Sequence, residues 1–536
     1  MAGNHLIGKQ LILLEFSTSD NTYVIQQKIS SLFWQKLVPE LNRLFDKVAG
    51  KNEVIRFDRI ELDIGSIDPG NRLENNEELV ARISRLLMEA IHDKLKSLSK
   101  EQDPGVREQQ DWKTFSRESE AEIPENYRNK ISSSGASQET PDPGDDPVDS
   151  PSQGTDTGLP LRRHYFDLWL YWLETGTLPS YSLEPNDNWI LAVLETLGLE
   201  HRAVSLLEEK IKKHPLALER LILQHHSADL RSITELFTGY SQASLPELIE
   251  EISDLIGSTP SLAQDLVPRE LEIEIWRQVF TKVIVKGEKA NSRSLFKHIA
   301  GLTVLSALKD EFIQAEENIK ALYPRVSEVL EHIPENPIAE APPKERFNSE
   351  QRIRTEEEQR ITDQEKKEME SPQFFKNAGM ILLHPFLNHF FQKTKLVVDE
   401  KFQDHYCQSK AVLLLHFLAT GEETVREYEM VLPKFLCAMP ANIPIDHNLK
   451  ITEEEKEEAV NMLRAVINHW QVLGNVSPEG LREGFLIREG KLTKEQTGWK
   501  LYVEQKTLDV LLDRLPWGLS VIKLPWMKDI LKVDWR

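Results

Sequence analysis

Two long stretches without an apolar period interrupt the chain and limit what it can fold into. Residues 101–160 contain 14 Asp or Glu and 5 Lys or Arg, which gives this stretch a net charge of −9 out of the total of −22. Residues 336–371 are nearly balanced in charge and almost free of large apolar residues. Neither stretch can bury enough apolar surface to offset the entropy of ordering it. We therefore expect flexible linkers, or at 336–371 a charged helical tether, between separate folded domains.

Residues 1–100 have the pattern of a small α/β domain with the order β-α-β-α. Residues 5–16 and 54–65 have the alternation or apolar content of strands. Apolar residues recur at three- and four-residue spacing over 25–48 and 79–98, as on one face of a helix. Pro39 is expected to kink or divide the first of these helices.

The remainder of the chain is predominantly helical. Residues 161–335 contain a series of helix-length apolar patterns, most of them ended by Gly, Pro or polar residues, and we predict a helical domain there. Residues 372–536 mix buried helices with a predicted hairpin over 487–505 and a looser strand at 519–525, which predicts an α+β domain. The fold class is therefore multidomain and predominantly α, with a small α/β domain before the helices and an α+β domain after them.

Charge and composition limit the classes of partner and compartment. A net charge of −22 over 536 residues repels phosphate backbones and anionic lipid, so we expect protein partners and no nucleic acid. Two cysteines are too few to stabilise a chain of this size by disulfides, and the first residues lack the pattern of a secretory signal. The apolar runs are too short to span a bilayer. We expect a protein of the reducing cytoplasm without an integral membrane segment.

Motifs that carry catalytic chemistry are missing from the sequence. It has no phosphate-binding Gly-rich loop with its Lys, no nucleophile elbow, no H-E-x-x-H and no paired C-x-x-C. The residues considered as metal ligands are His384, His389, His405, Cys407, His416 and Cys437. They lack the spacing that brings ligands together, and such residues within helices are more often core. We expect no enzyme, no cofactor and no metal.

The phrase Leu-Pro-Trp occurs twice near the end of the chain, at 515–517 and 524–526. Each proline fixes its own φ and disfavours the helical conformation for the preceding leucine, so the phrases should form corners on either side of a short strand. Two interpretations stay open for the indoles: internal packing, or an exposed aromatic anchor for a partner. Gly518 permits a tight turn after Trp517, so we expect Trp517 to be buried and Trp526 to be nearer the surface. Trp535 should return toward the core. The residues of this signature are Leu515, Pro516, Trp517, Gly518, Leu524, Pro525, Trp526 and Trp535.

Six phrases in the same order resemble the tape measure protein family of contractile injection systems, which are phage-tail-like particles. The phrases are HLIGKQLILLEF, IRFDRIELDIG, NAGMILLHPFLNHFF with His384, Pro385 and Phe386, LLLHFLATGEE with Gly421, LREGFLIREGKL and LPWGLSVIKLPWMKDILKVDW. The resemblance implies a non-enzymatic assembly protein that sets tube and sheath length through contacts with the baseplate or spike and with the inner tube. It also implies assembly in the cytoplasm and a place inside the assembled particle. The alternatives are a globular chaperone, baseplate or end-capping component of the same particle, and an enzyme or toxin cargo. The oligomeric state is left open.

Overall fold

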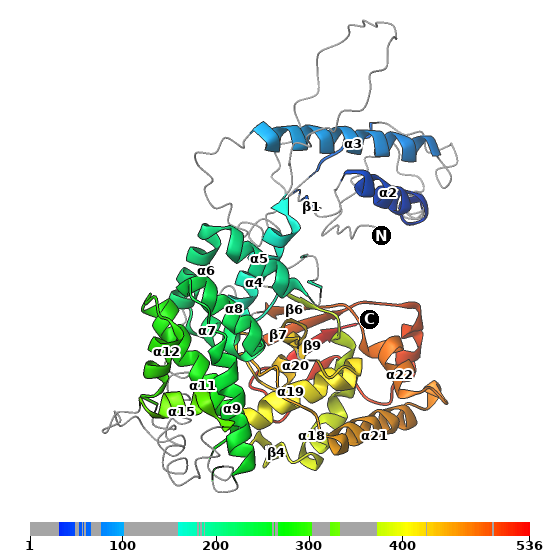
Figure 1. The fold of residues 1–536 in the computed structure, drawn as a ribbon. Helices are drawn as coiled ribbons and strands as arrows, with labels where there is room; N and C mark the ends of the chain where they lie inside the picture. Colours follow the sequence, from blue (N-terminus) through cyan, green and yellow to red (C-terminus); the bar gives the residue numbers. More distant parts are fainter. Residues whose placement is uncertain are drawn as a thin grey trace, which may run out of the picture. The chain divides into compact units, whose positions relative to one another are not determined.

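The computed structural model describes residues 32–48, most of 53–65, 77–100, most of 159–302, 322–332 and most of 372–535. The chain forms two compact units, Met1–His164 and Tyr165–Arg536. Helices predominate in both, with a small amount of sheet (Figure 1), so the helical part of the predicted fold class is confirmed. The predicted linkers 101–160 and 336–371 lie almost entirely outside the described residues.

The first unit is built on two helical segments. A π-helical turn η1 (Phe33–Leu37) leads into α2 (Val38–Val48), and α3 (Glu77–Lys100) packs against them. Their apolar faces meet in a small core of buried residues: Phe33, Leu37, Leu41, Leu44, Leu87 and Ile91. The change from π-helical to α-helical geometry falls beside Pro39, where the sequence predicts a kink.

Strand structure in this unit differs from the prediction. The predicted strand at 5–16 lies outside the described residues, and the one predicted over 54–65 is reduced to β1 (Glu53–Val54). β1 pairs antiparallel with β2 (Leu159–Pro160), so the end of the predicted linker is part of a strand pair. The alternation at 60–64 gave the wrong strand length, since the described residues from 55 to 65 are not assigned to a strand.

The helical part of the second unit confirms the expected series of short helices. They are α4 (Leu161–Thr175, which begins in the first unit), α5 (Trp189–Leu199), α6 (His201–Lys213), α7 (Pro215–Gln224), α8 (Ser227–Thr238), α9 (Ser244–Ser258), α11 (Pro268–Phe280) with η5 (Thr281–Val285), α12 (Ser292–Ile299) and α15 (Pro324–Leu330). Prolines occupy first-turn positions of three of them, where no backbone N–H is needed. Gly239 ends α8 with φ of 74°, a conformation that glycine adopts without a Cβ clash. Trp169 and Trp172 are buried in the core of these helices.

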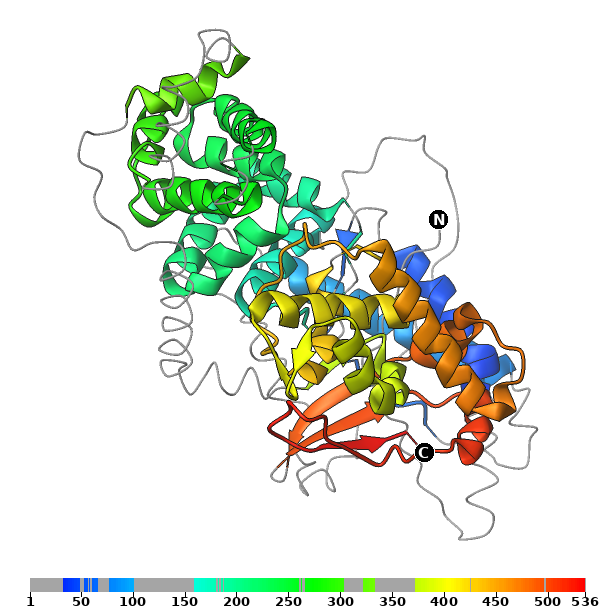
Figure 2. The same ribbon diagram turned by 90° about the horizontal axis from the view of Figure 1, so that it is seen from below.

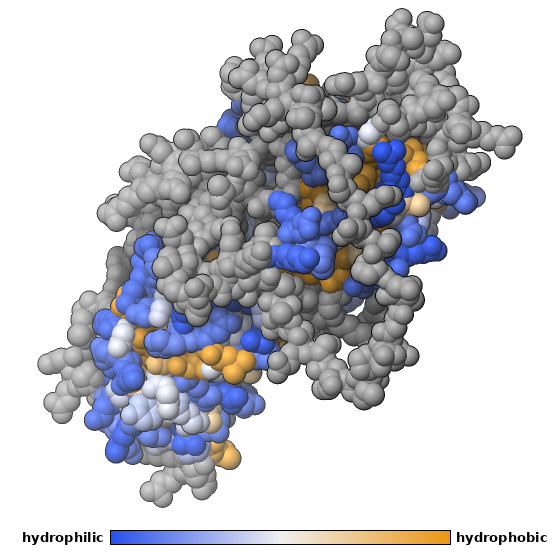
Figure 3. All heavy atoms as spheres, turned by 90° about the horizontal axis from the view of Figure 1, so that it is seen from above, coloured by the Kyte–Doolittle hydropathy of each residue, from blue (hydrophilic) through white to orange (hydrophobic). Residues whose placement is uncertain are grey.

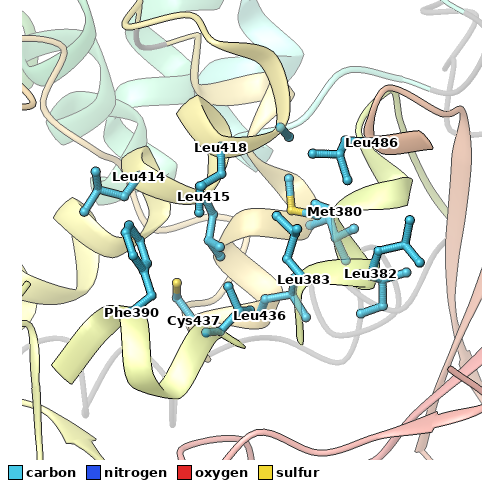
Figure 4. Close-up of a cluster of buried hydrophobic side chains, with 14 of the residues drawn as sticks. Met380, Leu382, Leu383, Phe390, Leu414, Leu415, Leu418, Leu436, Cys437 and Leu486 are labelled. Carbon is cyan, nitrogen blue, oxygen red and sulfur yellow. The ribbon is translucent and has the colours of Figure 1, made fainter. Parts of the chain in front are cut away.

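The last part of the chain packs helices around a second, larger apolar core. Its helical segments are η6 (Ala378–Leu383), α18 (His384–Lys393), α19 (His405–Thr420), η7 (Glu427–Glu429), α20 (Val431–Leu436), α21 (Glu453–His469), η8 (Gln471–Leu473), α22 (Pro478–Leu481), η9 (Arg482–Leu486) and η10 (Thr507–Arg514). Figure 4 shows side chains from η6, α18, α19 and α20 converging in this core. Gly379 is required here, since a Cβ on it would lie 1.7 Å from the carbonyl oxygen of Phe485. η6 and η9 can therefore pack backbone against backbone.

A five-stranded mixed sheet covers one side of this core. The strand order is β3 (Gln373–Phe375), β6 (Gly490–Glu495), β7 (Gly498–Val503), β9 (Leu531–Asp534) and β8 (Val521–Ile522). The hairpin β6–β7 confirms the one predicted, whereas the strand predicted over 519–525 contracts to two residues. The sequence did not predict β9, which pairs parallel to β7. Figure 2 shows the yellow helices lying along one side of the orange and red strands.

The helical part and the α+β part lie together in one compact unit. Figures 1 and 2 both show the green helices beside the yellow-to-red part. The predicted limits 161–335 and 372–536 as separate domains stay a prediction, and the contacts between the two parts are described below.

Candidate functional site

The first Leu-Pro-Trp phrase holds the chain against the start of α18. The half-buried indole of Trp517 packs edge-on against Phe386, with ring centroids 5.3 Å apart. Its Nε1–H donates to the carbonyl oxygen of Leu382 over 3.1 Å. A carbonyl in a 3₁₀ segment that turns into a helix therefore gains a side-chain donor. Pro516 and Gly518 are exposed, and Leu515 is half-buried.

The second phrase makes the same kind of contact on another part of the core. Trp526 is half-buried, and its ring lies 5.1 Å from that of Phe402 and 5.6 Å from that of Phe391, centroid to centroid. Its Nε1–H donates to the carbonyl oxygen of Leu436 over 2.7 Å. Leu524 is buried and Pro525 is exposed. Both indoles are half-buried and both N–H groups are bonded to backbone, so the expectation that Trp526 lies nearer the surface than Trp517 stays a prediction.

Trp535 returns to the core, as the sequence predicts. Its side chain is buried, and its Nε1–H donates to Asp509 Oδ2 over 3.1 Å. The other carboxylate oxygen of Asp509 accepts from Arg488 over 3.1 Å. Three tryptophans thus attach the last 21 residues of the described chain, 515–535, to the rest of the fold, two of them through phenylalanines of α18 and the third through Asp509. The contacts favour the packing interpretation.

The other residues singled out in the sequence, which belong to the family-like phrases, also have structural positions. His384 begins α18, with Nδ1 3.0 Å from the carbonyl oxygen of Ile381, and Pro385 occupies the first turn. Phe386 receives Trp517, as above. Gly421 ends α19 with φ of 80°, and the Arg482 guanidinium lies beside it, 3.3 Å from where a Cβ would be. The signature therefore joins the C-terminal segment to α18 and η6, while Gly421 lies in a different part of the fold.

A buried ionic cluster joins the helical part to the α+β part. Arg220 of α7 and Lys434 of α20 both bind the carboxylate of Glu427 in η7, with Arg220 Nε 2.7 Å from Oε2 and Lys434 Nζ 2.5 Å from Oε1. All three side chains are at most 1 % exposed. Backbone carbonyls accept the remaining donors, those of Leu173 and Asn442 from Arg220 and those of Ala441 and Ile443 from Lys434. These carbonyls compensate for the second positive charge.

This cluster affects the protonation of its lysine. Burial lowers the pKa of Lys434 to about 8, and Arg220 lowers it as well, while Glu427 acts in the opposite direction. The ammonium group is therefore retained at neutral pH by one carboxylate and two carbonyls. Removing that carboxylate would leave two cations in an interior without a counterion.

A second set of polar contacts lies farther along the same junction. Arg269 of α11 forms a forked pair with Asp446, with Nη2 2.7 Å from Oδ1 and Nε 3.0 Å from Oδ2. The backbone N–H of His447 donates to the carbonyl oxygen of Leu223 over 2.9 Å, and the amide of Gln224 donates to the carbonyl oxygen of Ile445 over 2.5 Å. The segment that precedes α21 is thereby attached to the helices of the other part.

Metal-binding chemistry is confined to one group among the described residues. Of the six His and Cys considered in the sequence, the structure brings only His416 into a group that could hold an ion, together with Glu422 and Glu429. Burial raises the pKa of the Cys437 thiol well above its usual value and that of Cys407 to about 11, so neither is a ready thiolate ligand. The carboxylates of this group were not identified in the sequence, where acidic residues are too abundant to single out.

The outer face of the five-stranded sheet carries both aromatic and charged side chains. Phe374 and Tyr502 are exposed, and the ammonium group of Lys491 lies 5.8 Å and 6.0 Å from their ring centroids. Lys500 lies 4.4 Å from the ring of Tyr502 and pairs with Asp534 over 2.9 Å. Figure 3 shows the molecule from another side, and there too hydrophobic side chains form groups between hydrophilic ones. In the part of the chain that the structure describes, no helix has the length and apolar content of a transmembrane span.

Comparison with known proteins identifies one family. A family model described as contractile injection system tape measure protein matches residues 4–535. Searches among curated proteins and among solved structures found no match. The match includes both Leu-Pro-Trp phrases and the residues of the ionic cluster.

Proposed function

Because the chain belongs to the contractile injection system tape measure protein family, we propose that it is a non-enzymatic assembly protein that sets the length of the tube and sheath. In this proposal it contacts the baseplate or spike and the inner tube, and the contacts are between proteins only. The net charge of −22, which disfavours binding to nucleic acid, supports this choice of partners.

The observation that carries the proposal is the contrast between the second unit and the stretches outside it. The two apolar cores make the described part of the second unit costly to unfold, and the Arg220–Glu427–Lys434 cluster joins them, so we assign this unit the role of a folded anchor. Length would then be measured by segments that can be extended without opening a core. The acidic composition of 101–160 supports that segment as the first candidate.

A second candidate function is a globular assembly factor of the same particle, that is, a chaperone, baseplate component or end cap. The buried cluster favours it, since a unit in which two apolar cores are joined can act without being stretched. An enzyme or toxin cargo is the least supported alternative, because the one carboxylate of the buried cluster, that of Glu427, serves packing and ion pairing.

Electron microscopy of particles assembled without this chain distinguishes the three functions. Tubes of uncontrolled length are expected for a length determinant. Missing or unattached baseplates would indicate the assembly factor, and particles of normal length that lack an activity would indicate a cargo. Either of the last two results would overturn the proposal.

A further inference from the structure

His416 lies on α19 with its imidazole sealed in the protein and without a partner. The residue is 0 % exposed, and neither Nδ1 nor Nε2 has a hydrogen bond within the described structure. A buried polar group without a hydrogen bond loses its solvation without compensation, so such groups are rare in native folds. Burial lowers the pKa of His416 to about 4, which leaves a neutral ring with a free lone pair at neutral pH.

Two carboxylates lie near this ring, that of Glu422 in the loop that follows α19 and that of Glu429 at the end of η7. Nε2 of His416 lies 3.8 Å from Glu429 Oε2, and one ligand atom each from His416, Glu422 and Glu429 lies within 4.8 Å of the others. The distance from Nε2 to the carboxylate is too long for a hydrogen bond. An imidazole and two carboxylates therefore converge without binding one another.

We propose that His416, Glu422 and Glu429 form a binding site for a divalent transition-metal ion of the Zn²⁺ class. A neutral imidazole nitrogen favours Zn²⁺ and similar ions over Mg²⁺ and Ca²⁺, which prefer oxygen ligands only. Two carboxylates balance the two positive charges of the ion. Three protein ligands leave one position of a tetrahedron open for water or for a group from another molecule.

The distances are compatible with an ion after a small contraction. Metal–ligand bonds of about 2.1 Å place neighbouring ligand atoms of a tetrahedron about 3.4 Å apart. Glu422 is the ligand that can move, since its side chain is 52 % exposed. His416 is fixed by the buried helix around it.

Arg426 occupies the position of a competitor for the two carboxylates. Its Nη1 lies 3.4 Å from Glu429 Oε1 and 3.7 Å from Glu422 Oε2. Arg426 balances the negative charge of the two carboxylates, but it makes no hydrogen bond to the imidazole of His416. A metal ion would satisfy all three groups at once and displace the arginine.

Metal binding would fix the loop that supports the junction of the second unit. The site links the end of α19 to η7. Within η7, Tyr428 directly precedes the proposed ligand Glu429, and its ring packs on that of Trp189 with centroids 6.1 Å apart. Glu427 of the ionic cluster precedes it. An ion at this site is therefore expected to raise the stability of the second unit.

Isothermal titration calorimetry of the full chain with Zn²⁺, in a buffer without chelator, tests the proposal. We expect one ion per chain at this site and a rise in melting temperature with added Zn²⁺. Glu429→Gln and His416→Gln should each weaken binding about tenfold or more. Glu423→Gln is the matched control, since it removes a neighbouring carboxylate that pairs with Lys456. Glu429→Gln lies at a half-exposed position and should fold, which keeps the test valid if His416→Gln does not.

The competing arginine gives a result of opposite sign. Arg426→Met should tighten Zn²⁺ binding, because it removes the cation that holds the carboxylates. Absence of binding to the wild-type chain would overturn the proposal and leave Arg426 as the resident cation. Equal binding by wild type and Glu429→Gln would also overturn it, since the ion would then be bound by other groups.

Discussion

Replacing Glu427 by Gln tests whether the buried cluster holds the second unit together. The substitution preserves the size of the side chain but removes the charge that faces Arg220 Nε at 2.7 Å and Lys434 Nζ at 2.5 Å. Breaking a buried pair by removing one partner costs about 3–5 kcal/mol, because an uncompensated charge remains. Here the cost has a limit, since Lys434 can lose its proton.

That limit can be calculated from the pKa of the lysine. In the folded wild type the pKa of Lys434 is about 8, so releasing its proton at pH 7 costs about 1.4 kcal/mol; the rest of the loss comes from Arg220, which stays charged without its partner. We therefore expect Glu427→Gln to lower the free energy of unfolding of the second unit by about 3–5 kcal/mol at pH 7.

The pH dependence identifies the mechanism. In the wild type the pKa of Lys434 is lowered to about 8, so its proton is released in the folded state above that pH while the unfolded chain keeps it. The unfolded state then binds more protons, and stability rises with pH. In the variant the same rise begins at lower pH. The destabilisation should therefore shrink by about 1.4 kcal/mol per pH unit as the pH approaches 8, and stay constant above it.

Urea unfolding followed by circular dichroism between pH 6 and 9 measures this dependence. Glu423→Gln serves as the control, since its pair with Lys456 is open to solvent and should contribute little to stability. A loss below about 1 kcal/mol for Glu427→Gln, or a loss that does not vary with pH, would refute the account of the cluster.

Two further predictions concern the tryptophans and the loss of stability at low pH. Trp517→Ala and Trp526→Ala should each destabilise the second unit by about 3 kcal/mol, because both rings pack on phenylalanines and both N–H groups bond to backbone. If a variant instead keeps its melting temperature but loses binding to tube or baseplate proteins, that tryptophan is an anchor for a partner. Burial lowers the pKa of His225 to about 4, so between pH 6.5 and 4 the unfolded chain takes up a proton at this residue that the folded chain does not. His225 alone should therefore contribute a fall in stability of about 3 kcal/mol as the pH drops through this range. His225→Gln should remove that part of the fall in denaturant titrations and leave the part that is due to His416.

Local pattern was enough to predict much of the helical structure. The apolar spacing at 79–98 and in the phrases from 161 onward gave helices that the structure confirms, and the turn residues between β6 and β7 gave the hairpin. Short strands were less predictable, because β1, β8 and β9 depend on partners distant in sequence. β9 pairs with β7 across about 30 residues, and no local signal indicates such a parallel neighbour.

The candidate site was predictable only where the local sequence determines the structure. Proline and tryptophan at 516–517 and 525–526 indicated corners, and the structure places both indoles on the core. Arg220 and Glu427 are 207 residues apart, and nothing in their local sequences distinguishes them from the other charged residues of the chain. The carboxylates near His416 were hidden for the same reason.

The most direct test of the proposed function is the length of particles that carry a longer chain. Insertion of about 40 polar residues between Asp142 and Thr157, with the second unit intact, should lengthen the tube by up to about 130 Å, at about 3.3 Å per extended residue. A matched deletion in the same segment should shorten it, and electron microscopy measures both. An unchanged length distribution in particles that contain the altered chain would contradict the proposal that this segment measures the tube.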